Sequence, residues 1–350
     1  MSDAFYLCGQ VILFLPWKHA KITIRDLMRR RRICHLRKKK IVVIGRSNLQ
    51  NLYIHTVLLK KLPAEIYLVD DQSKISVQDF NYASYYHADA TIHAGTFNEC
   101  RNADIVVFFQ EEMSNALFSK EDNVTLIKDK VKKMMATGFG GIVLVATAES
   151  NVVAALIKRF SGLPANQIIT LGTMLATSYF QVEIAQLFKI SPKNVHGYII
   201  GDNAEDVIPV WSRAFLGGKP ILSYLAEEQK RITAENLQSL TKMITKIPDF
   251  PFENKDGCTF HYSTVTVLAE LTEVILRDEA RVLTVGVEVK EAYGLESPVF
   301  ISVPAVIGAE GVRELLELNL SDDEQKELKQ IATKTTEKLE ILQLNKGGIS

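Results

Sequence analysis

Cysteine is scarce in this chain: the 350 residues include only Cys8, Cys34, Cys100 and Cys258. The four lie far apart, and no two of them have the spacing of metal ligands. We therefore expect neither a disulfide framework nor a metal site. Unpaired thiols are typical of a reducing compartment, so the sequence predicts a cytoplasmic protein.

An apolar run long enough to span a membrane is also lacking near the N-terminus. The segment "AFYLCGQVILFLPW" (4–17) is apolar but too short to cross a bilayer. A secretory signal carries its positive charge before the apolar run, whereas here the charge follows it, and no small-residue cleavage site comes after. We expect no membrane partner.

Net charge is zero, but it is unevenly distributed along the chain. Residues 1–40 hold eleven Lys/Arg against Asp3 and Asp26, so this segment carries +9 and the rest −9. The acidic remainder argues against nucleic-acid binding. The run "RRRRICHLRKKK" (29–40) would suit nucleic acid or anionic lipid, but charge runs are usually solvated. We interpret residues 1–38 as a basic, disordered leader.

What the sequence does contain is an alternation of apolar strands and helices, in a chain long enough for two domains. The expected strands are apolar throughout rather than at alternate residues. That pattern is typical of a parallel sheet covered by helices on both faces. The first half is therefore predicted to be α/β, with strands at 40–45, 65–71, 103–109 and 141–147 and helices at 48–62, 126–138 and 151–162.

The second half has a different pattern, with long helices and two strands before a last amphipathic helix. The last helix is expected to begin at Ser321, because "SDDE" puts a capping serine before acids in the first turn. The other expected elements are helices at 174–188, 223–246 and 263–276 and strands at 195–201, 281–289 and 299–308.

A strand followed by "GRSNLQ" and a helix is where a dinucleotide-binding fold places its G-x-G-x-x-G turn. Gly45 occupies the first position, but Ser47 and Gln50 occupy the second and third, where a side chain crowds the phosphates. Asp70 ends the next strand, where an acid can bind the ribose of NAD and repel the phosphate of NADP. Two interpretations remain open: weak NAD binding, or a plain strand-to-helix turn with a turn-forming aspartate.

Several longer segments resemble the L-lactate/malate dehydrogenase family, in particular the bacterial lactate dehydrogenases. They are "GFGGIVLVAT", "SGLPANQIITLGTMLATSYF", "NVHGYIIGDNAEDVIPVWSRAFLGGKPI" and "SPVFISVPAVIGAEGVRELLELNL". The resemblance covers roughly residues 39–342. It implies a Rossmann-type doubly wound parallel sheet domain (39–170) and an α+β lactate/malate dehydrogenase-type domain (171–346). It also implies dimers or tetramers, and hydride transfer between NADH and a 2-keto acid.

The same resemblance identifies departures at the expected catalytic site. The family's Gly-Glu-His-Gly loop carries its general acid/base histidine where this chain has Asn203. The aspartate that orients the histidine is replaced by Ala176, and the arginine that grips the substrate carboxylate by Tyr179. The family's asparagine after the fourth strand is replaced by Ala148, whereas Thr259 keeps its substrate-pocket identity.

The remaining family positions are also altered. Thr147 joins Gly45, Ser47 and Asp70 as the expected cofactor-binding positions. The lid region 108–123 contains no arginine and carries Glu111 and Glu112. His196 matches the sugar-phosphate activator site of the bacterial enzymes, but Gln181 replaces its arginine partner.

The substitutions favour a catalytically degenerate homologue that serves as a binding, regulatory or assembly protein. An amide cannot shuttle a proton, and a positioned acid/base supplies roughly 10²–10⁴ in rate. The alternative is a divergent NAD-dependent L-2-hydroxy acid oxidoreductase. Asp202, Asp206 or His261 would then have to replace the histidine, although loop acids are more often solvated or capping groups.

Overall fold

Six parallel strands form the first part of the sheet, in the order β3-β2-β1-β4-β5-β6. This order is that of the doubly wound dinucleotide-binding fold. β4 and β5 are buried at every residue, as expected of a parallel sheet covered on both faces. The strands are β1 (Lys39–Ile44), β2 (Ala64–Val69), β3 (Thr91–Ala94), β4 (Ile105–Phe109), β5 (Ile142–Ala146) and β6 (Ile168–Thr170).

The structure is a computed structural model, and it describes residues 38–45, 48–69, 74–87, 90–109, 121–202, 206–226, 232–245 and 261–344. Lys39–Ser350 belong to one compact unit, which is the part considered below. Within the described residues, no helix is both long and apolar enough to cross a membrane.

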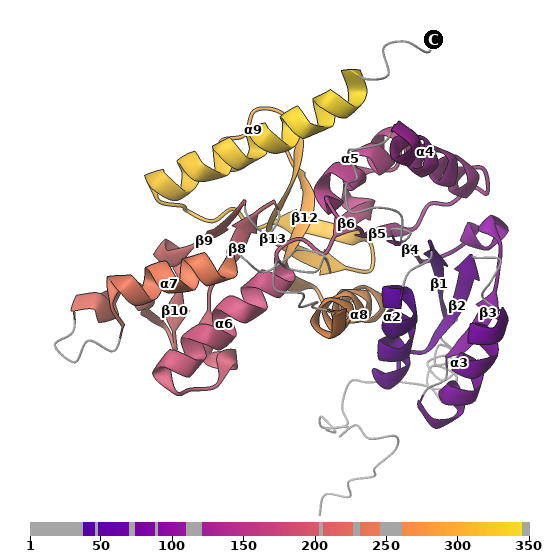
Figure 1. Ribbon diagram of the computed structural model, residues 1–350, viewed down its shortest axis with the longest axis horizontal. Helices are drawn as coiled ribbons and strands as arrows, with labels where there is room; N and C mark the ends of the chain where they lie inside the picture. The colour runs from indigo at the N-terminus through magenta and orange to yellow at the C-terminus, as the bar shows by residue number, and fades with distance from the viewer. Residues whose placement is uncertain are drawn as a thin grey trace, which may run out of the picture. The chain divides into compact units, whose positions relative to one another are not determined.

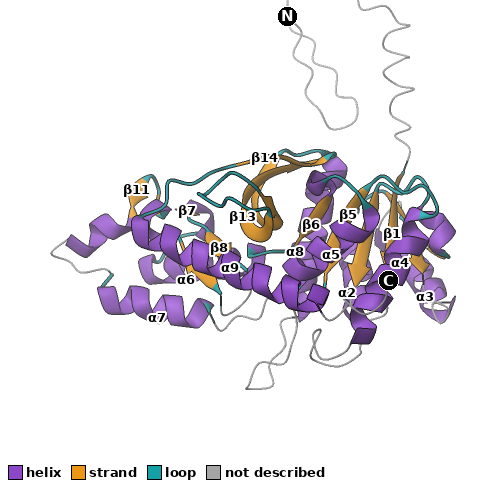
Figure 2. Cartoon of the chain, turned by 90° about the horizontal axis from the view of Figure 1, so that it is seen from above, coloured by secondary structure: helices purple, strands orange, loops and turns teal. Residues whose placement is uncertain are grey.

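Helices pack on both faces of the parallel strands (Figures 1 and 2). On one face, α2 buries Leu49, Tyr53 and Val57 in the same core as Ile41 and Val43 of β1, with α3 packed beside it. On the other face, α4 and α5 pack against the opposite side of the same strands. The helices are α2 (Asn48–Leu59), α3 (Lys74–His87), α4 (Glu121–Met135) and α5 (Ser150–Ser161). The predicted α/β sheet covered on both faces is confirmed.

The second part of the chain extends the same sheet with antiparallel strands. β12 pairs with β6 through Gly286 and Thr170, and β13 then pairs along the whole of β12. The added strands are β12 (Arg281–Val289), β13 (Val299–Gly308), β14 (Gly311–Leu315), β8 (Ile199–Gly201) and β9 (Val207–Pro209). A separate small sheet contains β7 (Val195–His196), β10 (Phe215–Leu216) and β11 (Lys219–Pro220).

Four long helices accompany these strands: α6 (Met174–Phe188), α7 (Ala234–Ile244), α8 (His261–Arg277) and α9 (Asp322–Leu344). The predicted start of the last helix is confirmed, because the Ser321 hydroxyl accepts from the Glu324 N–H and the Glu324 carboxylate accepts from the Ser321 N–H. Short 3₁₀ turns lie at Phe97–Cys100, Ala165–Gln167, Pro192–Asn194, Trp211–Arg213 and Ile221–Ala226.

Several predicted elements are wrong in extent: the helix predicted at 126–138 spans Glu121–Met135, the one at 48–62 ends at Leu59, and two others are divided. The run 195–201 is not one strand. β7 (Val195–His196) pairs with β10, whereas β8 (Ile199–Gly201) pairs with β9 and β13, and between them the Gly197 carbonyl accepts a hydrogen bond from the Gln181 side chain. β7 and β8 therefore belong to different sheets. The predicted helix at 223–246 is replaced by the 3₁₀ turn Ile221–Ala226 and by α7.

Candidate functional site

The β8–β9 hairpin presents the loop where the resemblance places the catalytic group. Its base is closed by a hydrogen bond from the Asp202 N–H to the Asp206 carbonyl, at 2.8 Å. Gly201 has φ +127°, and a Cβ there would lie 2.3 Å from the Asp206 carbonyl oxygen, so only glycine fits. Asn203 lies outside the described residues. The backbone that flanks position 203, at Asp202 and Asp206, is therefore held in place.

The side chain of Asp202 is turned into the protein rather than toward solvent, and the residue is 2% exposed. One carboxylate oxygen accepts from Asn151 Nδ2 at 2.8 Å, and the other accepts from Thr335 Oγ1 at 3.0 Å. Lys338 Nζ lies 3.7 Å from the second oxygen. Asn151 itself accepts from Thr170 Oγ1 at 3.0 Å. Asp202 therefore anchors the loop to α5 and α9.

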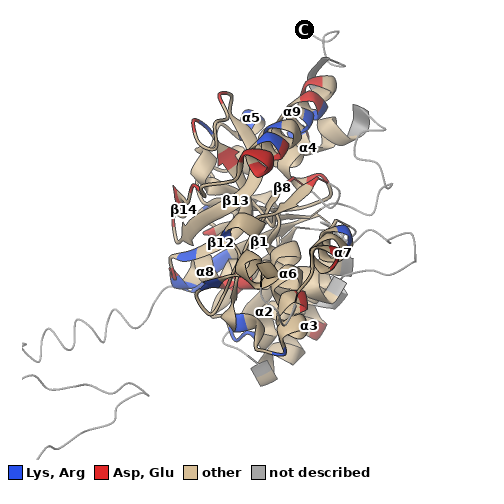
Figure 3. Cartoon of the chain, turned by 90° about the vertical axis from the view of Figure 1, so that its left-hand side faces the viewer, with Lys and Arg blue, Asp and Glu red and all other residues tan. Residues whose placement is uncertain are grey.

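A second carboxylate completes this charged cluster between α5 and α9. Glu149 pairs with Lys338 at 3.2 Å, and it has a left-handed backbone with φ 49°. Burial raises the pKa of both Glu149 and Asp202, although Lys338 opposes the shift. Burial also lowers the pKa of Lys338, but attraction to Asp202 and Glu149 outweighs this and raises it overall. The remaining hairpin acid, Asp206, pairs with Lys334 at 2.5 Å. In Figure 3, acidic and basic residues follow one another along the ribbon of α9.

Helix α6 carries the two positions at which the resemblance expects charged side chains. Its start is tied to β8 by a hydrogen bond from Thr173 Oγ1 to the Ile199 carbonyl, at 2.5 Å. Ala176 lies in the first turn, 8% exposed, in an apolar cluster that includes Phe180 and Val207. Tyr179 is half-buried three residues later. A methyl group and a phenol thus lie where the resemblance expects a carboxylate and a guanidinium.

The end of β5 places Thr147 and Ala148, which are 3% and 4% exposed. Within the described part of the chain, the Thr147 hydroxyl has no hydrogen-bond partner. An orphaned buried hydroxyl costs stability unless a ligand or water satisfies it. This position therefore suits a polar ligand at the carboxyl end of the parallel strands, where doubly wound folds bind nucleotides.

Packing is enough to require glycine at the turn after β1. Gly45 has φ +104°, and a Cβ would lie 2.2 Å from the Phe109 carbonyl oxygen at the end of β4. Glycine is thus required here whether or not a dinucleotide binds. Gln50 is buried in the first turn of α2, at 5% exposed. Ser47 and Asp70 lie outside the described residues. Of the described positions, the Thr147 hydroxyl favours NAD binding, and Gln50, which stands where the family has glycine, argues against it.

The other predicted residues are placed as follows. Thr259 and the lid acids Glu111 and Glu112 lie outside the described residues, and so does the side chain of His261. His196 is exposed on β7, while the Gln181 amide donates to the Gly197 carbonyl at 3.2 Å. Among the described residues, no group of histidine, cysteine and carboxylate side chains could hold a metal ion.

The sequence did not lead us to Asn151, Glu149, Thr335 or Lys338 as supports of the loop. The pairing partners lie up to 189 residues apart in the chain, as between Glu149 and Lys338. The only local sign was the polar run "ESN" directly after an apolar strand. Contacts between residues so far apart in the sequence can be recognised only in the folded structure, where α9 packs against α5.

Comparisons with known proteins agree with this architecture. The family model described as lactate/malate dehydrogenase, alpha/beta C-terminal domain matches residues 173–343. An L-lactate dehydrogenase of Geobacillus thermodenitrificans (strain NG80-2) is 33% identical over 297 residues, which cover 82% of this chain and 92% of that relative. One of Geobacillus stearothermophilus is 33% identical over 296 residues, with the same coverage.

Solved structures resemble the chain over nearly its whole described length. A lactate dehydrogenase from a Medee basin deep-sea metagenome library is 28% identical with a TM-score of 0.78, covering 88% of this chain and 100% of that one. The ligands-bound form of the minor L-lactate dehydrogenase from Enterococcus mundtii is 26% identical with a TM-score of 0.78, covering 87% and 98%. The sheet order, the loop hairpin and these similarities together establish that the chain belongs to the lactate/malate dehydrogenase family.

Proposed function

We propose that this chain is a catalytically degenerate member of its family and serves as a binding, regulatory or assembly protein. The observation that carries the proposal is the buried position of Ala176 in an apolar cluster on α6. No carboxylate at that position can orient a proton carrier on the neighbouring hairpin. Because catalytic groups act as a unit, losing the histidine, its orienting acid and the substrate arginine together removes the reaction rather than altering its specificity.

The hairpin acids do not offer a replacement base. Both oxygens of Asp202 already accept hydrogen bonds from Asn151 and Thr335, and Asp206 is paired with Lys334. A general base must lie within hydrogen-bond reach of the proton that it removes. Turning Asp202 outward would leave the donors of α5 and α9 unsatisfied, so its inward position supports a structural role.

The first prediction is that the protein does not reduce pyruvate, oxaloacetate or branched 2-keto acids with NADH. Steady-state NADH oxidation is the measurement, and a bacterial L-lactate dehydrogenase assayed in parallel is the positive control. Turnover above the buffer blank that disappears in Asp202→Asn or Asp206→Asn would contradict the proposal. It would instead favour a divergent NAD-dependent L-2-hydroxy acid oxidoreductase, which the names of the curated relatives support.

The second prediction concerns the cofactor. We propose weak binding of NAD(H) in preference to NADP(H), because Asp70 would repel a 2′-phosphate and the orphaned Thr147 hydroxyl suits a polar ligand. Gln50 and Ser47 stand at two glycine positions of the phosphate turn, so affinity should be low. A neighbour of similar fold, the lactate dehydrogenase of Cryptosporidium parvum, is described as complexed with lactic acid and nicotinamide adenine dinucleotide. Calorimetry with NADH and NADPH tests the order, and tighter NADPH binding would reverse it.

Assembly and location complete the proposal. We infer a homodimer or homotetramer, since closed two-fold oligomers are the commonest assemblies, and light scattering at micromolar concentration would give the size. Cys100, the one cysteine within the described residues, is buried and unpaired, as a reducing cytoplasm allows. Nucleic-acid and membrane partners form no part of the proposal.

A further inference from the structure

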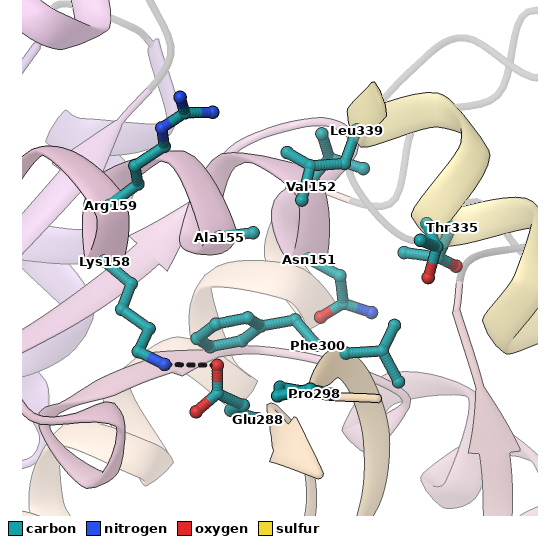
Figure 4. A pocket seen from close by; sticks show the side chains of 12 residues that line it. Asn151, Val152, Ala155, Lys158, Arg159, Glu288, Pro298, Phe300, Thr335 and Leu339 are labelled. Carbon is teal, nitrogen blue, oxygen red and sulfur yellow. Dashed lines mark hydrogen bonds and ion pairs between the residues drawn. The ribbon is translucent and has the colours of Figure 1, made fainter. Parts of the chain in front are cut away.

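A cavity of about 260 Å³ opens between α5, the paired strands β12 and β13, and α9 (Figure 4). None of the residues predicted for substrate or cofactor lines it. Most of its wall is apolar: Val152 and Ala155 come from α5, Phe300 from β13 and Leu339 from α9. A cavity with an apolar wall and a few polar groups at one end is the usual form of a small-molecule site.

The polar end of the cavity carries one more cation than anion. Lys158 of α5 forms an ion pair with Glu288 of β12, and this pair spans the cavity end in Figure 4. Arg159 also lines the cavity, is exposed, and points away from that pair in the same view. Within the described residues, no carboxylate pairs with Arg159. Arg159 therefore gives this end of the cavity its net positive charge.

The other polar side chains in the wall are already engaged. Asn151 bonds Asp202 and Thr170, while Thr335 bonds Asp202 and the Ile331 carbonyl. The end of helix α5 accounts for part of the positive charge, because basic residues there offset the helix dipole. It does not account for the apolar hollow beside Arg159. Recognition of a ligand is thus left to one guanidinium and an apolar wall.

We propose that this cavity binds a small monocarboxylate with an apolar tail, of the branched-chain or arylacetic class. The exposed Arg159 side chain, which points outward in Figure 4, turns toward the cavity to meet the carboxylate in a charge-assisted hydrogen bond, and the tail lies against Ala155 and Phe300. The volume lies just below the usual range of about 300–1,000 Å³ for ligand sites, which limits the ligand to about ten non-hydrogen atoms. This site does not depend on the proposed loss of reductase chemistry.

Calorimetry on the full chain tests the proposal with phenylacetate, phenylacetamide and phenethylamine, since none of the three carries a keto group that the family's reaction could reduce. We expect phenylacetate to bind with a dissociation constant of roughly 1 mM, as weak small ligands do, and at least about fivefold tighter than the amide or the amine. Equal binding of the acid and the amide, or no binding of the acid at 10-fold this concentration (~10 mM), would overturn the proposal.

Three variants locate the binding. Arg159→Gln removes the unpaired cation at an exposed position and should weaken phenylacetate about fivefold. Ala155→Leu narrows the cavity where the tail would lie and should weaken binding. Arg101→Gln removes an exposed arginine that does not line the cavity, and should change nothing. Unaltered binding in both Arg159→Gln and Ala155→Leu would place the ligand elsewhere and refute the assignment.

Discussion

Replacing Asp202 with alanine should lower the free energy of unfolding by about 3 kcal/mol, since the change leaves the buried Asn151 amide without its acceptor and Lys338 without one of its carboxylates, while the Thr335 hydroxyl keeps the Ile331 carbonyl. Asn151 Nδ2 and Thr335 Oγ1 both donate to this carboxylate, and Lys338 lies 3.7 Å away. These donors come from α5 and α9, so the loss should loosen both helices from the β8–β9 hairpin. Urea unfolding followed by circular dichroism is the measurement.

Two matched substitutions separate the anchor from ordinary charge loss. Asp202→Asn keeps the shape and one acceptor, so it should cost only about 1 kcal/mol. Asp206→Asn removes the neighbouring acid of the same hairpin, whose partner Lys334 has a side chain 58% exposed, and should cost less than about 1 kcal/mol. If Asp202→Ala lowered the free energy of unfolding no more than Asp206→Asn does, the buried hydrogen bonds of Asp202 would not stabilise the fold.

The difference in unfolding free energy between wild type and Asp202→Asn should also depend on pH. Burial raises the pKa of the Asp202 carboxyl above its ordinary 3.8, with Lys338 opposing the shift. The folded state therefore holds this proton more tightly than the unfolded chain. The stability advantage of wild type should fall as the pH rises from 3.8 through the folded pKa, and then level off. An advantage that grows with pH over this range would show that attraction to Lys338 outweighs burial. Glu149 is present in both proteins, so the effect of its burial is common to them, and only the part of its pKa shift that comes from the Asp202 charge differs.

Long apolar or amphipathic segments were predictable from sequence, and several were predicted to the residue. The strands Arg281–Val289 and Val299–Gly308 and the helix Met174–Phe188 have the predicted bounds, because a sustained pattern outweighs local ambiguity. The elements α3 and β3 were missed. α3 exposes Tyr82, Tyr85 and Tyr86 and so lacks a clear apolar face, and β3 has only four residues.

The resemblance names the residues expected at the site, and these stay predictions, but it could not give the orientation of their side chains. The resemblance identified Ala176, Tyr179 and Ala148 as departures, and the structure places all three in buried or half-buried walls. The direction of Asp202 could not be predicted, since it is set by Thr335, which lies 133 residues further along the chain. A carboxylate in a polar loop looks like a solvated base until its partners are placed.

Restoring the family's orienting carboxylate with Ala176→Asp should destabilise this protein before it helps catalysis. The new side chain would enter an apolar cluster beside Phe180 and Val207, where an unpaired polar group costs about 1–3 kcal/mol. Adding Asn203→His supplies a partner and should recover part of that loss. The recovery, measured as the coupling in a double-mutant cycle of unfolding free energies, should exceed about 0.5 kcal/mol. Ala176→Asn is the matched control, because it has the same size without the charge.

Activity should nevertheless stay low in every combination. Asn203→His alone should give no pyruvate-dependent NADH oxidation, because nothing at Ala176 holds the ring in one tautomer and Tyr179 cannot grip a carboxylate. The triple variant with Ala176→Asp and Tyr179→Arg should turn over detectably, yet at least about 10²-fold below a bacterial L-lactate dehydrogenase. The residual deficit follows from the segment 108–123, which contains no arginine and carries Glu111 and Glu112, which would repel an anionic keto acid. Substantial turnover from Asn203→His alone would mean that one substitution, rather than the loss of a whole catalytic unit, separates this chain from its active relatives.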